Sequence, residues 1–174
     1  MTKIPGLAGV EPVDHGIGRS RGGLTTKTHA LVDGRGLPLV IAVTPGHSHD
    51  SPALARLLVE LRVPKLGPGR PRTTPAALRA DKAYSGRPNR ELLQARGVKV
   101  VIPEKSDAVA RRKATGSHGG RPLAFDADDY KNRNVVERTF NTIKSWRGLA
   151  TRYDKHALVY RGGVVLASIV LWLS

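Results

Sequence analysis

Two runs of β-branched and apolar residues, LTTKTHALV at 24–32 and LPLVIAVTP at 37–45, are separated only by the sequence DGRG. Such runs, joined by a short turn that contains glycine, predict two antiparallel strands in a hairpin. The hairpin restricts the fold strongly, because its apolar face has to be covered by other elements of the chain.

A helix is predicted directly after the hairpin, over residues 51–62. The apolar residues that recur there at helical spacing are Leu54, Leu57, Leu58 and Leu61. Asp50 is expected to cap this helix at its N-terminus, with Pro52 in the first turn.

A β-α-β pattern follows. A short strand is expected to end near Asp81, a helix over 87–97 closes at Gly97, and VKVVIP at 98–103 predicts the next strand. Because β-α-β units place their strands in parallel, we expect an α/β fold whose sheet contains parallel strands.

Three other segments have no such pattern. Residues 1–23 are rich in glycine and predict a flexible basic N-terminal segment, and 104–122 predicts a mobile polar loop that meets phosphate. The apolar tail at 162–174 is too short to cross a bilayer and predicts a buried helix or strand.

Composition indicates the kind of partner. The 174 residues include 29 Lys and Arg against 14 Asp and Glu, for a formal charge of +15, and this favours a polyanion, with nucleic acid first. The absence of cysteine excludes disulfides and thiolate zinc sites. The first residues contain no apolar signal-peptide core, so we expect a cytoplasmic protein.

A long helix predicted over 128–147, after acidic residues that begin with Asp126, carries the most informative pattern. At about 100° per residue, one sector of roughly 60° contains the polar residues Tyr130, Arg133, Glu137 and Lys144. Val135, Val136, Ile143 and Trp146 point broadly the other way and are expected to pack. A lone Glu between basic residues is also typical of a solvated ion pair.

Asp81 offers a second carboxylate, because it ends a strand where open α/β sheets display functional side chains. Carboxylates that gather in one site need a cation, and two Mg²⁺ ions held this way serve phosphoryl transfer. A motif of weaker value is HSHD at 47–50, which has metal-ligand spacing but lacks further convergent residues.

The spacing from Tyr130 through Arg133 and Glu137 to Lys144 resembles the Y-x2-R-x3-E-x6-K signature of bacterial insertion-sequence transposases of the DDE type. The blocks GRSRGGLTTKTHALVDGRGLPL, RADKAYSG and YRGGVVLASIVLWL are similar to those of the insertion-sequence-five group. The resemblance implies an RNase H-like mixed sheet flanked by helices. It also implies three carboxylates that bind two Mg²⁺ ions, with Mn²⁺ as a substitute, and that cut and join double-stranded DNA at transposon ends and target.

Carried over by position, the resemblance implies that Asp81 and Glu137 are catalytic metal ligands. Tyr130, Arg133 and Lys144 would contact the DNA backbone or support the glutamate. Two basic segments supply the other residues that we expect to bind DNA. These are Arg19 and Arg21 in the first segment, and Arg111, Arg112 and Lys113 in the second.

The family's first catalytic aspartate, on the first central strand, has no counterpart here. Asp14 lies in the following loop, Asp33 in the hairpin turn, and Asp50 is assigned to the helix cap. We therefore expect residues 24–174 to form a partial catalytic domain that lacks its first central strand, exposes the edges of the neighbouring strands and is inactive alone.

Several origins and functions fit this expectation. The chain would be a second reading frame fused to an upstream polypeptide, a decayed remnant, or the product of a misplaced start codon. Another transposase subunit is a further candidate partner. The alternative functions are a noncatalytic DNA-binding remnant or regulator and, less favoured, a ribosome-associated basic protein.

Overall fold

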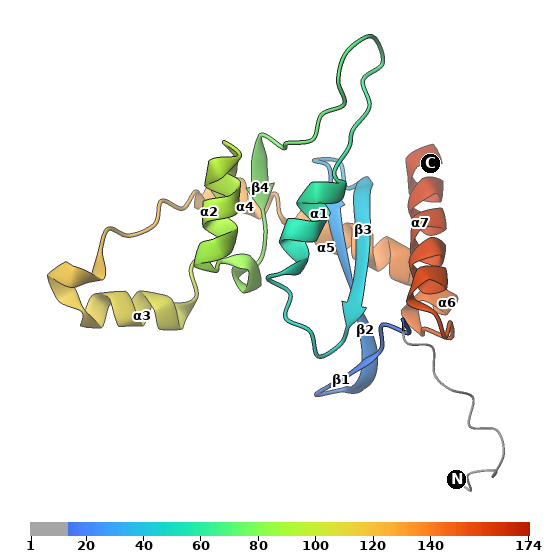
Figure 1. Ribbon diagram of the computed structural model, residues 1–174, viewed down its shortest axis with the longest axis horizontal. Helices are drawn as coiled ribbons and strands as arrows, with labels where there is room; N and C mark the ends of the chain where they lie inside the picture. The colour runs from blue at the N-terminus through green and yellow to red at the C-terminus, as the bar shows by residue number, and fades with distance from the viewer. Residues whose placement is uncertain (1–13) are drawn as a thin grey trace, which may run out of the picture.

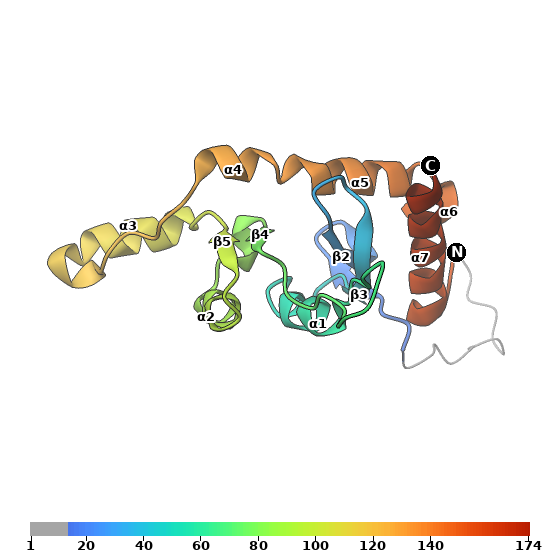
Figure 2. The same cartoon turned by 90° about the horizontal axis from the view of Figure 1, so that it is seen from above.

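The computed structural model describes residues 14–174, and all structural statements concern this part of the chain. The molecule is elongated, with helix α3 (Ser106–Ala114) at one end and helix α7 (Ala157–Leu173) at the other (Figure 1). Two small sheets lie between these ends, with helices on both sides (Figure 2). The architecture is thus mixed α/β, as predicted.

The first sheet contains the predicted hairpin. Strands β2 (Gly23–Val32) and β3 (Pro38–Pro45) pair antiparallel, with Thr28 opposite Val43, and the short β1 (Gly18–Ser20) pairs antiparallel with the start of β2. The Asp33 carboxylate stabilises the turn by accepting from the backbone N–H groups of Arg35 and Leu37, each at 2.9 Å. Such bonds explain why aspartate begins the turn.

The predicted β-α-β unit forms the second sheet. Strands β4 (Ala77–Arg79) and β5 (Lys99–Val101) are parallel, and helix α2 (Arg87–Ala95) connects them after the short 3₁₀ helix η1 (Lys82–Tyr84). Gly97 follows the helix with φ +67, a conformation that glycine adopts without steric cost.

Helix α1 (Ala53–Glu60) covers one face of the first sheet and contacts α2, so its leucines serve two cores. In the first core, Leu57 packs with Val40 and Ala42 of β3. The second core contains residues of α1, β4, α2 and the segment around β5, namely Leu54, Leu58, Leu78, Leu93, Val98 and Ile102. Burial of each such side chain contributes roughly 1.5–3 kcal/mol.

The expected cap of α1 is wrong. Pro52 occupies the N-cap position, and the Asp50 side chain makes no capping hydrogen bond. Its carboxylate instead accepts from the Lys27 ammonium at 2.9 Å, because Lys27 of β2 lies within reach.

The helix predicted over 128–147 is divided into α4 (Ala127–Lys131) and α5 (Asn134–Lys144). The backbone between them tightens, since Asn132 and Arg133 donate to carbonyls three residues earlier, and the two helices run on in nearly one direction (Figure 2). Ile143 is buried as predicted, whereas Trp146 is half exposed, so its predicted packing is wrong.

The apolar tail is helical. After the short α6 (Arg147–Ala150), α7 packs on β3 through Tyr160 and Val164, and Arg161 donates to the Ile41 carbonyl at 2.7 Å. Its other face is exposed at Leu166, Ile169 and Val170, so the tail is only partly buried. None of the helices in the described chain has the length and apolar content that a membrane span requires.

Two predicted flexible segments differ from expectation. Ser106–Ala114 forms α3 and Gly116–Gly119 forms a 3₁₀ helix (η2), because Asp107 at the start and basic residues at the end favour a helix even without a buried face. In the segment 1–23, Gly18–Ser20 is strand β1, and residues 1–13 lie outside the described part. The division at residue 23 and the RNase H-like topology stay predictions.

Candidate active site

The Asp81 carboxylate follows β4, as the sequence predicted. Leu78 anchors this strand in the core, and Asp81 itself begins η1 in an extended conformation, with its side chain about half exposed. The strand thus presents the carboxylate at the sheet edge, beside the junction of α4 and α5.

Arg133 joins the two predicted catalytic carboxylates. Its guanidinium donates to Asp81 Oδ2 at 3.3 Å and to Glu137 Oε1 at 2.6 Å. The Arg133 side chain is 26% exposed, against 47% for Asp81 and 54% for Glu137. The two acidic groups therefore converge on one cationic group that is less accessible to water than either of them.

Tyr130 lies one helical turn before Arg133, and its carbonyl accepts from the Arg133 backbone N–H at 2.9 Å. Its ring packs against that of Phe125, with a centroid distance of 5.3 Å. Burial and the carboxylates of Asp81 and Glu137 raise the pKa of the Tyr130 hydroxyl, and nearby Arg133 opposes them. The hydroxyl remains a neutral hydrogen-bond donor at physiological pH.

A set of ion pairs fixes α4 on the second sheet. Arg79 of β4 donates to Asp129 Oδ1 at 2.6 Å, and Lys99 of β5 pairs with Asp129 at 3.0 Å and with Asp126 at 3.1 Å. The Asp126 carboxylate also accepts from the Asp129 N–H, which confirms the predicted acidic helix start. Arg79 and Lys99 lower the pKa of the Asp129 carboxyl.

The other half of the helix is fixed to the hairpin. Thr139 Oγ1 on α5 donates to the carbonyl of Gly36 at 2.7 Å, in the turn between β2 and β3. Gly36 has φ +97, and an added Cβ would lie 3.0 Å from Thr139 Oγ1. The α4 and α5 segment thus spans both sheets and carries Arg133 between its two anchors.

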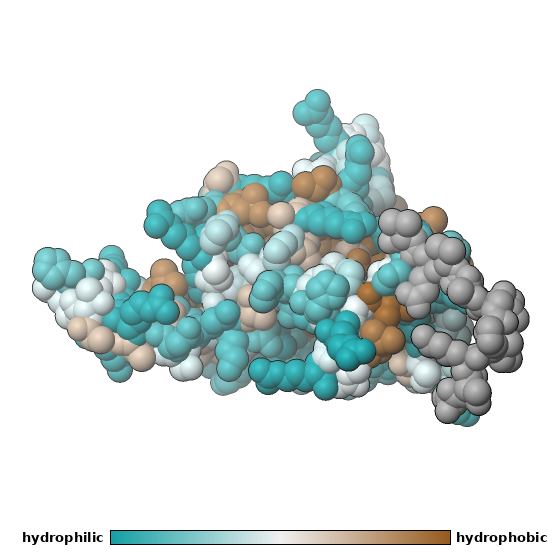
Figure 3. All heavy atoms as spheres, turned by 60° about the horizontal axis from the view of Figure 1, so that its bottom comes forward, coloured by the Kyte–Doolittle hydropathy of each residue, from teal (hydrophilic) through white to brown (hydrophobic). Residues whose placement is uncertain are grey.

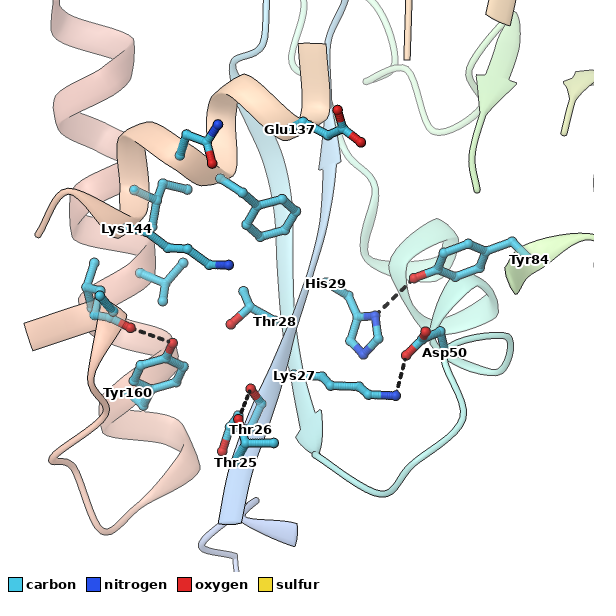
Figure 4. Close-up of a pocket in the computed structure, with 16 residues that line it drawn as sticks. Thr25, Thr26, Lys27, Thr28, His29, Asp50, Tyr84, Glu137, Lys144 and Tyr160 are labelled. Atoms are coloured by element: carbon cyan, nitrogen blue, oxygen red, sulfur yellow. Dashed lines mark hydrogen bonds and ion pairs between the residues drawn. The ribbon is translucent and has the colours of Figure 1, made fainter. Parts of the chain in front are cut away.

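Lys144, the last predicted signature residue, is not at the carboxylate pair. It lines an adjoining cavity of about 630 Å³ between α5 and β2, where its ammonium is directed toward Thr28 (Figure 4). Glu137 lies at the rim of the same cavity with its carboxylate turned away from Lys144.

Polar residues that the sequence did not single out line the opposite wall of this cavity. His29 of β2 contacts the Tyr84 hydroxyl through Nδ1 at 3.0 Å and Thr44 Oγ1 through Nε2 at 2.8 Å, next to the pair of Lys27 and Asp50. The sequence offered one signal for this group, because Lys27 and His29 alternate along a strand and so share one of its faces. The partners of His29 are distant in the sequence, so no local pattern predicted their contact with it.

Burial is the largest cause of the pKa shifts of His29 and Tyr84. It lowers the pKa of the His29 imidazole, with Lys27 acting in the same direction and Asp50 opposing. Burial, with the charges of Asp50 and Asp81, raises the pKa of the Tyr84 hydroxyl to about 12. Both groups are therefore neutral at physiological pH.

The remaining predicted DNA-binding residues lie away from the carboxylates. Arg19 and Arg21 are exposed in and beside β1, and Arg111 and Lys113 are exposed on α3. Arg112 is paired with Glu104, and both side chains are largely buried. Hydrophilic side chains cover most of the face drawn in Figure 3.

The acidic residues fit a metal ion only as a pair. Asp81 and Glu137 supply the hard oxygen ligands that Mg²⁺ and Mn²⁺ prefer. Both carboxylates already contact the guanidinium of Arg133. Within residues 14–174, no three His, Cys, Asp or Glu side chains gather closely enough to hold a metal. His47 and His49 in the HSHD motif belong to no such group either.

An α/β scaffold that presents Asp81, Arg133 and Glu137 at a sheet edge defines a candidate site for chemistry on phosphate groups. Comparison with protein families identifies the chain: residues 9–172 match the transposase DDE domain, and the chain belongs to this family. It is therefore a protein of DNA transposition, a class that acts on DNA.

A protein of Brucella ovis named "Putative transposase for insertion sequence element IS6501" is 34% identical over 150 residues. The alignment covers 86% of this chain and 99% of the relative. No solved structure matches the chain.

Proposed function

We propose that the chain supplies part of an active site for metal-dependent cleavage and strand transfer of DNA at insertion-sequence ends. The observation that carries this proposal is the contact of one guanidinium, that of Arg133, with both Asp81 and Glu137. Two carboxylates that lie within reach of one cationic group can also share a divalent ion.

In this proposal Asp81 and Glu137 hold Mg²⁺ or Mn²⁺. The bound metal would activate water and stabilise charge on the scissile phosphate. Arg133, between the carboxylates, would neutralise the DNA phosphate that approaches them. The Tyr130 hydroxyl would donate a hydrogen bond to the phosphate backbone of the DNA.

The DNA strand would extend from this site along the cavity lined by Lys144. Lys144 and Lys27 line this cavity, although Lys27 is already paired with Asp50. Arg19, Arg21, Arg111 and Lys113 are exposed and would add nonspecific phosphate contacts. Arg112 contributes least, because Glu104 already neutralises it.

A second candidate function is DNA binding without cleavage, by a remnant or regulator that occupies the transposon ends. It is favoured by the finding that, within residues 14–174, no third His, Cys, Asp or Glu side chain joins Asp81 and Glu137 in a group that could hold a metal. A two-metal mechanism uses more acidic ligands than this pair, so the isolated chain would bind DNA and remain inert.

A cleavage assay separates the two candidates. The purified chain is incubated with DNA that carries the ends of its element, with Mg²⁺ or Mn²⁺, and nicked and joined products are measured. The matched variants are Glu137→Gln at the site and Glu91→Gln on α2, where Glu91 pairs with Arg87 at the surface.

Cleavage that disappears in Glu137→Gln but persists in Glu91→Gln, with DNA binding retained in both, supports the enzyme. Binding without cleavage by the unmutated chain supports the noncatalytic alternative. Cleavage that survives in Glu137→Gln refutes the assigned role of Glu137.

A further inference from the structure

The connection between α1 and β4 projects away from both sheets (Figure 1). Val63 and Arg72 close it at its base, because the backbone N–H of each donates to the carbonyl of the other, at 2.9 and 2.8 Å. Residues 64–71 between them are all exposed, Leu66 completely so. Packing in the core therefore does not explain the composition of this loop, residues 63–72, which we call the finger.

The backbone of the finger is thin. Its sequence PKLGPGRP at 64–71 contains three prolines, which fix φ and remove N–H donors, so the segment forms neither a helix nor a regular strand pair. Gly67 and Gly69 carry no side chain, and Gly69 has φ +132, a conformation that favours glycine. A Cβ added at Gly67 would meet no atom within 4 Å. Around these glycines, apart from the Pro68 ring, the finger is therefore little wider than its backbone.

The finger carries positive charge without acidic partners. The sequence from 61 to 80 contains no Asp or Glu, whereas the finger and the residue before it contain Arg62, Lys65, Arg70 and Arg72. All four side chains are exposed, and none of them pairs with a carboxylate within residues 14–174. Cations without counter-charges on a thin, solvated chain form a surface for a polyanion.

The base of the finger reaches the candidate active site. A cavity of about 620 Å³ is lined by Val63 and Arg72 of the finger and by Arg133, which joins the two carboxylates. Arg35 and Arg79 also line this cavity, and both pair with carboxylates. Arg72 is thus the arginine of this cavity whose charge is not matched by a carboxylate of the described chain. A DNA strand that leaves Arg133 through this cavity would meet Arg72 and then the finger.

We propose that the finger enters the minor groove of double-stranded DNA and prefers A·T base pairs. This groove is about 6 Å wide, so it is too narrow for a helix or a two-stranded ribbon but accepts a thin chain such as residues 67–69. The proposal rests on the class of the protein, which acts on DNA, and not on the metal-dependent cleavage proposed above.

The preference for A·T pairs follows from the Arg70 guanidinium, which has only donors. The floor of the minor groove presents acceptors alone at A·T pairs, whereas G·C pairs add the amino group of guanine, which opposes another donor. Runs of A·T pairs also narrow the groove and strengthen its negative potential, which attracts arginine. Lys65 and Arg72, on either side of the thin segment, would contact the flanking phosphates.

Binding of the full chain to three labelled duplexes tests the proposal, in EDTA and about 0.1 M salt. The duplexes share their length and flanks, and their centres contain A·T, G·C or inosine·cytosine pairs. Inosine lacks the amino group of guanine in the minor groove but keeps the major-groove pattern of G·C. Fluorescence anisotropy should show that the A·T and inosine duplexes bind at least about tenfold more tightly than the G·C duplex.

Two matched pairs of variants assign the preference to the finger. Arg70→Gln should reduce it to about twofold or less, whereas Arg111→Gln, at an exposed position of α3, should weaken binding to all three duplexes by one factor and keep the preference. Gly67→Val retains every charge but widens the finger, and should also remove the preference. Gly148→Val in α6, where an added Cβ likewise meets no atom within 4 Å, should keep it. Circular dichroism confirms that the variants fold.

Three results would overturn the proposal. Equal affinity for the three duplexes would mean that the finger contacts phosphate alone or remains a solvated loop. An inosine duplex that binds like the G·C duplex would place the contact with the bases in the major groove. A preference that survives in Arg70→Gln and Gly67→Val would assign it to another part of the chain. Because EDTA removes divalent ions, these outcomes concern the finger and are independent of whether the chain cleaves DNA.

Discussion

Arg133 donates a hydrogen bond to Asp81 at 3.3 Å, and the two residues are 52 positions apart in the sequence. The contact joins the end of β4 to the junction of α4 and α5, and the same guanidinium holds Glu137. A positive side chain therefore lies where the proposed metal would bind.

The first prediction concerns competition between Arg133 and a divalent ion. Because the guanidinium contacts both carboxylates, Arg133→Gln should tighten Mn²⁺ binding, by a few-fold up to about tenfold, as expected when a competing ion pair of about 1 kcal/mol is removed. Electron paramagnetic resonance of free Mn²⁺ measures the affinity. Arg138→Gln, at an exposed position of α5, is the control and should leave it unchanged. Weaker Mn²⁺ binding by Arg133→Gln would mean that Arg133 supports the metal ligands.

The second prediction concerns Asp50. Asn is as good a helix cap as Asp but carries no charge, so Asp50→Asn separates the two roles. The observed pair with Lys27 predicts a loss of about 0.5–1 kcal/mol, after allowance for the one-third exposure of both side chains, and a smaller loss at high salt. Urea unfolding in low and high salt measures it. An unchanged free energy of unfolding would restore the capping role.

The sequence predicted those features whose signals are local. The DGRG turn, the closing Gly97 and the strand before Asp81 each depend on neighbouring residues, and each is found in the structure. The pair of His29 and Tyr84 is separated by 55 positions, so no periodicity connects its members. The helix pattern alone could not identify Glu137 as a site residue, because one acidic residue on a basic helix is more often part of a surface ion pair. The family signature was needed to single it out.

Errors in the sequence predictions have physical causes. Asp50 was assigned to a helix cap because the preference of aspartate for that position was the only information in the sequence. In the three-dimensional structure its carboxylate pairs with Lys27 instead. No residue of the segment that became α3 is fully buried, so the apolar pattern that normally marks a helix was absent. Its charge pattern, with Asp107 first and basic residues last, was the remaining signal.

The third prediction concerns the anchor of α5 on the hairpin. Thr139→Val keeps the shape of the side chain but removes the bond to the Gly36 carbonyl, and should lower the free energy of unfolding by about 1 kcal/mol. Gly36→Ala should cost at least as much, because φ is +97 and the new Cβ would crowd Thr139. Thr142→Val, whose hydroxyl bonds only within its own helix, is the control for Thr139→Val. Equal losses in the two threonine variants would argue against an anchor.

The fourth prediction concerns pH. The pKa of His29 is lowered in the folded chain, so below the unfolded value of about 6.5 the unfolded state binds more protons than the folded state. The contribution of neutral His29 to the free energy of unfolding is therefore fully present above that pH. It falls as the pH drops below that value, by at most about 1.4 kcal/mol per pH unit for one proton.

Urea unfolding between pH 7.5 and 5 compares the unmutated chain with His29→Gln and with His118→Gln, an exposed residue of η2. His29→Gln should be less stable at pH 7.5, because the contacts with Tyr84 and Thr44 are altered, but should lose less stability on acidification. His118→Gln should follow the unmutated chain. If His29→Gln retains the full acid dependence, another group takes up the proton, and the neutral His29, which links β2 to η1, does not control stability in this range.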